Sequence, residues 1–119
     1  MNRIDLQDKL TKITAPWQPG IIAEANGQHF KLARFLGDYP WHSHAEVDEA
    51  FFVLEGQFTM EFRTHQVQLT EGQMIVVPKG TEHRPVAESA CSVLLIEPAG
   101  TVSTGDADTS NLTSTGQWI

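Results

Sequence analysis

The sequence is short of cysteine, of basic residues and of long apolar runs, and each shortage excludes a class of protein. Cys91 is the one cysteine among 119 residues, so the chain cannot form an internal disulfide, which is typical of a reducing compartment. We expect Cys91 to be a small buried apolar side chain, because nothing near it in sequence lowers the pKa of its thiol. Eight Lys and Arg stand against 15 Asp and Glu, for a net charge of -7. Because these basic side chains are scattered, we expect neither nucleic acid nor an anionic membrane as a partner.

No apolar run approaches the length that a membrane span requires. Residues 1–10 also lack the apolar segment of a secretion signal. We therefore expect a soluble, cytoplasmic protein. Its 40% hydrophobic content, with six Phe and three Trp, is that of a folded chain, and this length suffices for one domain with one core.

Composition divides the chain into three regions. Residues 1–20 predict a short amphipathic helix or an N-terminal arm, and the apolar positions that recur there among charged side chains are Ile4, Leu6, Leu10 and Ile13. Residues 21–98 predict a β domain. Residues 99–119 are rich in Thr, Ser, Gly and Asp, and they predict a mobile polar tail that docks at its end through Trp118 and Ile119.

Strand signals follow one another through the β region. The runs IIAEA and QHFKLARF flank Asn26-Gly27, which is the strongest short-range signal of a β-hairpin. Further predicted strands are AFFVLE, QFTMEF, QVQL, QMIVV, a stretch that begins near His83, and CSVLLIE. Because these strands are short and no helix is long enough for a crossover, the fold class is all-β, an antiparallel sandwich or barrel.

The chain has five His, and the spacing of three of them is informative. Residues two apart in a strand point to the same face, so His42 and His44 can present both imidazoles to one site. Glu49 begins the next predicted strand, and His83 comes from a distant one. Three imidazoles and one carboxylate suit a divalent first-row transition ion.

Spacing alone leaves the carboxylate ligand open. Glu46 and Asp48 compete with Glu49 for this role. His29 and His65 lie beside turns, where we expect exposed polar side chains rather than ligands.

Two blocks of residues resemble the motifs of the cupin superfamily. The first block consists of His42, His44, Glu49 and Gly56. The second consists of Gly72, Pro78, Gly80 and His83. The resemblance covers about residues 21–98 and implies a double-stranded β-helix, the jelly-roll barrel of cupins. It also implies one divalent transition metal per chain, Fe, Mn, Ni or Zn, with His42, His44, Glu49 and His83 as the ligands.

The chain is also similar to bacterial mannose-6-phosphate-isomerase-like cupins, and we expect a small-molecule ligand that is sugar-like, an enol or dicarbonyl, or phenolic. A metal-dependent isomerase or dioxygenase and a non-catalytic metal-binding or sensing module both remain open. The residues that we expect to line the pocket are Trp41, Phe51, Phe58, Met60 and Phe62. A phosphorylated substrate would need a cationic clamp, for which the candidates are Lys31, Arg34, Arg63, Lys79 and Arg84.

We further expect a homodimer. Both faces of residues 50–55 and 73–77 carry apolar side chains, more than the interior of so small a barrel takes up. Specificity must come from the pocket wall, from the tail after Gly100, or from a second subunit, because the chain is too short for a separate substrate domain.

Overall fold

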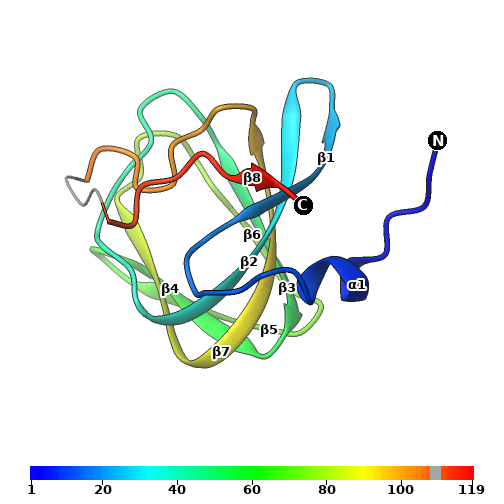
Figure 1. Cartoon of the computed structure of the whole chain (residues 1–119). Coiled ribbons are helices and arrows are strands. Elements are labelled where there is room, and N and C mark those ends of the chain that lie inside the picture. Colours follow the sequence, from blue (N-terminus) through cyan, green and yellow to red (C-terminus); the bar gives the residue numbers. More distant parts are fainter. Residues whose placement is uncertain (108–110) are drawn as a thin grey trace.

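A computed structural model of the chain describes residues 1–107 and 111–119, and in this part of the chain it contains one helix and eight strands (Figure 1). The elements are α1 (Leu6–Leu10), β1 (Gly20–Ala25), β2 (Gln28–Asp38), β3 (Glu49–Glu55), β4 (Gln57–Phe62), β5 (Gln66–Thr70), β6 (Met74–Val77), β7 (His83–Pro98) and β8 (Gln117–Trp118). The expected all-β fold and the short N-terminal helix are confirmed.

Strand β7 organises the barrel because its two halves pair with different neighbours. The first half lies between β4 and the end of β2, and the second half lies between β2 and β3. Hydrogen-bonded neighbours in the sheet follow the order β5-β4-β7-β2-β1-β8. Strand β3 also pairs with β7, and β6 pairs with β3. The sheet therefore closes over itself into the jelly-roll barrel seen in Figure 1.

The prediction of two separate strands after residue 80 was wrong, because they form the single 16-residue strand β7. The pairing of β2 with β7 shifts register between Phe35 and Gly37, opposite the exposed residues 88–90. Such a bulge bends a strand without ending it. In the sequence, the exposed residues 88–90 at this bulge resemble a loop between two short strands.

Two apolar clusters lie on opposite sides of the sheet. The interior of the barrel is filled by a cluster that includes Phe35, Phe51, Val53, Phe58, Met60 and Val93. On the outer face, Leu10 and Ile13 pack against Ile22 and Leu32, which fixes α1 on the barrel. The side chain of Asp5 caps the helix by accepting from the amide of Asp8 at 3.2 Å.

Glycine is required in two turns of the barrel, where the backbone has a positive φ. Asn26 and Gly27 both have positive φ, 53° and 74°, as the predicted hairpin requires. Gly56 joins β3 to β4 with a φ of 82°, and a Cβ there would lie 3.0 Å from the carbonyl oxygen of Ala90. Cys91 packs beside this turn, is fully buried, and has its pKa raised to about 11 by burial, which confirms the expectation of a structural thiol.

The C-terminal region returns to the barrel. Strand β8 runs parallel to β1, and the backbone carbonyl of Ile119 accepts from Lys9 Nζ at 2.6 Å. Residues 101–107 form turns against the barrel rather than a free tail; residues 108–110 of the predicted tail lie outside the described residues. Within the described chain, no helix has the length and apolar character needed to cross a bilayer.

Candidate metal centre

His42 and His44 lie on the connection between β2 and β3. The prediction that a strand carries them was wrong, because the segment makes a single isolated bridge between His42 and His83. In this bridge the two residues exchange backbone hydrogen bonds of 3.0 and 2.9 Å. The carbonyl of His44 is held in turn by the amide of Gly80 at 2.7 Å. Backbone contacts with the second motif thus aim both imidazoles inward without a regular strand.

The structure brings the four predicted ligands together. His42, His44, Glu49 and His83 are all buried, and each offers a ligand atom within 4.8 Å of the others. Glu49 occupies the inward phase of β3 together with Phe51. The competing carboxylates lie outside: Glu46 is exposed, and exposed Asp48 accepts from the amide of Lys79 at 2.8 Å.

The ring nitrogens are arranged as a metal needs them. The Nδ1 atoms of His42 and His83 donate to the carbonyls of Pro40 at 2.9 Å and Thr81 at 2.8 Å. These bonds fix the tautomer that leaves each Nε2 with its lone pair toward the group. Such backbone anchoring of a ligand imidazole is the usual companion of metal binding by histidine.

Three atoms of the group are buried without a hydrogen-bond partner: His44 Nε2, His83 Nε2 and Glu49 Oε1. The glutamate oxygen lies 3.0 Å from the first nitrogen and 3.4 Å from the second, without hydrogen-bond alignment. Ligands about 2.1 Å from one ion lie about 3 Å apart when adjacent and just over 4 Å apart when opposite. The observed separations fit an ion at the centre, and orphaned buried polar atoms call for a partner.

Electrostatics favours the protonation states that bind metal. Burial, with the neighbouring His83, lowers the pKa of His42 to about 4, so its imidazole is neutral at pH 7. Burial opposes ionisation of Glu49, but its interactions with His44 and His83 outweigh burial and hold the pKa of this carboxyl below its usual range. Neutral imidazoles and an ionised carboxylate are the forms that coordinate a cation.

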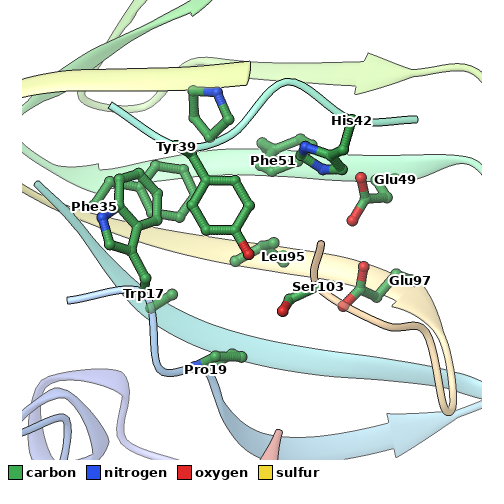
Figure 2. A pocket seen from close by; sticks show the side chains of 12 residues that line it. Trp17, Pro19, Phe35, Tyr39, His42, Glu49, Phe51, Leu95, Glu97 and Ser103 are labelled. Atoms are coloured by element: carbon green, nitrogen blue, oxygen red, sulfur yellow. The ribbon is translucent and has the colours of Figure 1, made fainter. Parts of the chain in front are cut away.

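A small cavity of about 40 Å³ adjoins this group (Figure 2). Its residues are Trp17, Pro19, Ala33, Phe35, Tyr39, His42, Glu49, Phe51, Pro85, Leu95, Glu97 and Ser103. Trp17 stacks on Phe35 with ring centroids 4.7 Å apart, and its indole nitrogen donates to the carbonyl of Leu36 at 2.8 Å. The N-terminal arm and the C-terminal region thus supply wall residues, Trp17 and Ser103, that the sequence did not indicate.

Of the five aromatic and Met residues expected at the pocket, Phe51 lines this cavity. Phe58 and Met60 lie in the barrel core instead. Trp41 lies beneath the guanidinium of Arg63, 3.9 Å from the ring centroid, and Phe62 stacks on His65. Alternation along β4 places Phe58, Met60 and Phe62 correctly on one face, but it does not say how far along the barrel axis the cavity lies.

The two remaining histidines differ from each other. His65 is exposed, as expected. The expectation was wrong for His29, whose side chain is 12% exposed, pairs with Glu24 at 2.8 Å and meets the edge of Trp118. The C-terminal strand covers this histidine, and such a long-range contact leaves no local signal.

A buried ion pair at the cavity was missed by sequence reasoning. Lys31 and Glu97 are 1% and 2% exposed, and Lys31 Nζ donates to Glu97 Oε1 at 2.8 Å. Burial and the adjacent Glu49 raise the pKa of Glu97 to about 8, against the opposing pull of Lys31. Strand alternation could have indicated this pair. Lys31 lies on the same inward face of β2 as Phe35, and Glu97 lies on the same inward face of β7 as Val93.

The cations considered for a phosphate clamp do not converge on the cavity. Arg34 donates to the backbone carbonyls of Ile13 and Leu10. Arg63 pairs with Glu82, and Arg84 donates to Glu61 at 2.8 Å. Among the described residues, Lys31 is the one of the five candidates whose side-chain cation pairs with a cavity residue, Glu97, and this pairing leaves it unavailable to a phosphate.

Comparisons with known proteins agree with this architecture. The family model of the cupin domain matches residues 36–97. A cupin-2 domain protein from Shewanella frigidimarina is 42% identical, with a TM-score of 0.78 over 80% of this chain and 93% of that chain. A protein from Neisseria meningitidis is 41% identical, with a TM-score of 0.75 over 82% and 99% of the two chains.

Two further similarities are less extensive. An uncharacterized protein of Bacillus subtilis, YdbB, is 41% identical over 64 residues, which are 53% of this chain and 57% of that protein. This chain therefore spans little more than half the length of that curated relative. The hydroquinone 1,2-dioxygenase PnpCD, solved in complex with Cd²⁺ and 4-hydroxybenzonitrile, shares the fold at 18% identity and a TM-score of 0.65, over 77% of this chain and 70% of that chain.

Proposed function

This chain belongs to the cupin family, and on that premise we propose that it binds one divalent transition ion and acts on a small organic molecule in the adjoining cavity. His42, His44, Glu49 and His83 are the proposed ligands, and Fe, Mn, Ni or Zn are the candidate ions. Bound there, such an ion would supply Lewis-acid or redox chemistry to a substrate.

The observation that carries the metal proposal is the set of orphaned buried atoms, His44 Nε2, His83 Nε2 and Glu49 Oε1. An unsatisfied buried polar atom costs roughly 1–3 kcal/mol. Three such atoms that face one another are explained if they share a cation.

The cavity favours a small, largely apolar molecule. Its wall is mostly apolar and includes the rings of Trp17, Phe35, Tyr39 and Phe51. Its volume of about 40 Å³ holds about three water molecules. The paired cations argue against a phosphorylated sugar, so the isomerase of a sugar phosphate is the weaker choice and an enol, dicarbonyl or phenol the better one. PnpCD, which shares the fold, is a hydroquinone 1,2-dioxygenase that was solved in complex with Cd²⁺ and the phenol 4-hydroxybenzonitrile.

Metal content tests the first part of the proposal. Untagged protein purified without chelators is expected to carry about one equivalent of metal per chain, and H42A and H83A are expected to lose it. H65A is the matched control, because it removes an exposed imidazole outside the group. Substoichiometric metal that H42A and H83A leave unchanged would contradict the proposal.

Burial of the ligands favours one alternative, a module that binds or senses a metal without turnover. The most exposed ligand, His44, has 8% of its surface open to solvent, which restricts approach to the ion. Metal-loaded protein that converts no sugar, enol, diketone or phenol in a broad screen would favour this alternative. Homodimerisation and a cytoplasmic location stay predictions.

A further inference from the structure

The small cavity shares two of its wall residues with a larger cleft. The cavity of about 40 Å³ lies inside the barrel, whereas the cleft of about 330 Å³ lies between the N-terminal arm and the C-terminal region. Trp17 and Pro19 line both of them. These two residues of the arm therefore form the partition between the cleft and the interior of the barrel.

The cavity is too small for an organic ring while the indole of Trp17 is in place. A cavity of about 150 Å³ binds benzene, which is far more space than the cavity offers. The indole stacks on Phe35 with ring centroids 4.7 Å apart, and its centroid lies 4.6 Å from that of Tyr39. Figure 2 shows these rings on one side of the cavity, with Glu49 and Glu97 on the other. The indole thus fills an aromatic slot that also fits the flat ring of a ligand.

The segment that carries this indole is weakly held. In the described chain, residues 14–18 make two hydrogen bonds to the barrel, and Trp17 donates both. Its amide donates to the carbonyl of Arg34 at 2.9 Å, and its indole nitrogen donates to the carbonyl of Leu36 at 2.8 Å. The second bond is exposed to solvent, so water can replace it at little cost. Pro16 has no amide hydrogen with which to add a third.

The backbone of Trp17 is also strained. Its φ is 64°, in the left-handed region where the Cβ atom of a residue with a side chain is crowded. Such strain persists only where the surrounding contacts hold it. Here those contacts are the aromatic stack and the two hydrogen bonds. Release of the indole relieves the strain, which lowers the cost of moving Trp17 out of the slot.

We propose that Trp17 is the gate of the ligand site: a flat aromatic molecule enters from the cleft, and its ring replaces the indole against Phe35 and Tyr39. The inference deepens the proposed function and rests on it, because a ring in this slot lies next to a proposed metal ligand. The imidazole of His42 is 5.4 Å from the ring of Tyr39, centroid to centroid.

The lining of the cleft suits a polar substituent on such a ring. It includes the side-chain amides of Gln18 and Gln117, the hydroxyl of Thr14 and the ammonium of Lys12. Within the described chain these four groups have no hydrogen-bond partner, and no Asp or Glu lines the cleft. The cleft therefore offers donors to a hydroxyl or carbonyl oxygen, and a phenol has the ring and the substituent that the two spaces require.

The first test follows the indole hydrogens of the unmodified protein. The chain has three Trp, whose indole N–H signals in ¹⁵N NMR spectra are assigned with W41F and W118F. Phenol and cyclohexanol are titrated into metal-free and into zinc-loaded protein. Saturation with phenol is expected to speed solvent exchange of the Trp17 N–H about tenfold, because the bond to Leu36 opens. Cyclohexanol, whose puckered ring is thicker than the slot, is expected to leave this exchange unchanged.

Substitution of Trp17 provides the second test. W17A removes the ring that a ligand must displace, so phenol is expected to bind it about tenfold more tightly than the unmodified protein. W118A is the matched control, because Trp118 is 60% exposed and lines neither the cavity nor the cleft. Its affinity for phenol should be unchanged. Zinc affinity of W17A, measured by chelator competition, should stay within about threefold, since Trp17 is not a proposed ligand.

Three results would overturn the gate: no saturable binding of phenol in the millimolar range, binding that leaves exchange of the Trp17 N–H unchanged, or equal effects of phenol and cyclohexanol on it. Phenol that binds folded W17A no more tightly than the unmodified protein would overturn it as well. The exchange measurement does not use W17A, so it decides the question even if that variant does not fold.

The two proposals fail in different ways. If the unmodified protein takes up no zinc but phenol releases the Trp17 indole in the metal-free form, the metal proposal fails and the gate stands. If zinc binds and the indole does not respond to phenol, the gate fails alone.

Discussion

Gly105 offers a sharp test of whether the C-terminal region holds the proposed metal ligands in place. It has a φ of 53°, and a methyl group added there would lie 2.3 Å from the carbonyl oxygen of Ser43 and 3.2 Å from His42 Cδ2. Ser43 stands between His42 and His44. The segment is also clamped by Asp106, whose Oδ1 accepts from the amide of Ser43 at 2.7 Å and whose Oδ2 accepts from its hydroxyl at 3.1 Å.

The substitution G105A is expected to lower both the stability of the protein and its affinity for metal. Left-handed backbone costs a residue with a side chain roughly 1–2 kcal/mol, which is about 3–10 °C in Tm for a domain of this size. In addition, the two segments must separate by about 1 Å, the difference between 2.3 Å and the 3.4 Å of an ordinary contact. Because that shift displaces a ligand-bearing backbone, we expect metal affinity to fall about 10- to 100-fold.

G72A is the matched control. Gly72 has a φ of 83°, and a methyl group there would meet nothing within 4 Å. The G72A variant has the same backbone strain as G105A but no steric clash. Its Tm should therefore fall while its metal affinity stays unchanged. Both quantities are measured by thermal unfolding of metal-free protein and by chelator competition. If G105A bound metal as tightly as G72A, the C-terminal region would not support the ligands.

Three further predictions follow from the same structure. D106A removes both bonds to Ser43 without adding bulk, so chelator competition should show a metal affinity reduced several-fold, and an unchanged affinity would leave the clamp without a role. Cys91, whose pKa is raised from 9.0 to about 11 by burial, should react with iodoacetamide at pH 8 about 100-fold more slowly in folded than in denaturant-unfolded protein. Since its folded pKa is the higher one, stability should also decline as pH rises from 9 through 11, and equal labelling rates in the two states would contradict the buried thiol. Met74 and Val76 on β6 are 55% and 52% exposed, so light scattering at micromolar concentration should give twice the 13.2 kDa of one chain, and a monomeric mass would refute the dimer.

The fold and the four residues that gather in the candidate site could be predicted because their signals are local. Alternation of apolar residues gives strands, Asn26-Gly27 gives the hairpin, and the two motifs carry His42, His44, Glu49 and His83 with recognisable spacing. Glu49 was favoured over Asp48 by the resemblance to the first cupin motif, in which its distance to Gly56 fits. In the structure the phase of β3 turns the side chain of Glu49 inward, while Asp48 is exposed.

By itself, the sequence determined an all-β chain with one site made of three imidazoles and a carboxylate. Tertiary structure decided what surrounds that site. Trp17, Ser103 and Gly105 reach it from the two ends of the chain, and Lys31 meets Glu97 across paired strands β2 and β7. The physical reason is that strand alternation fixes which face a side chain takes, whereas its neighbours depend on how distant segments close around the barrel.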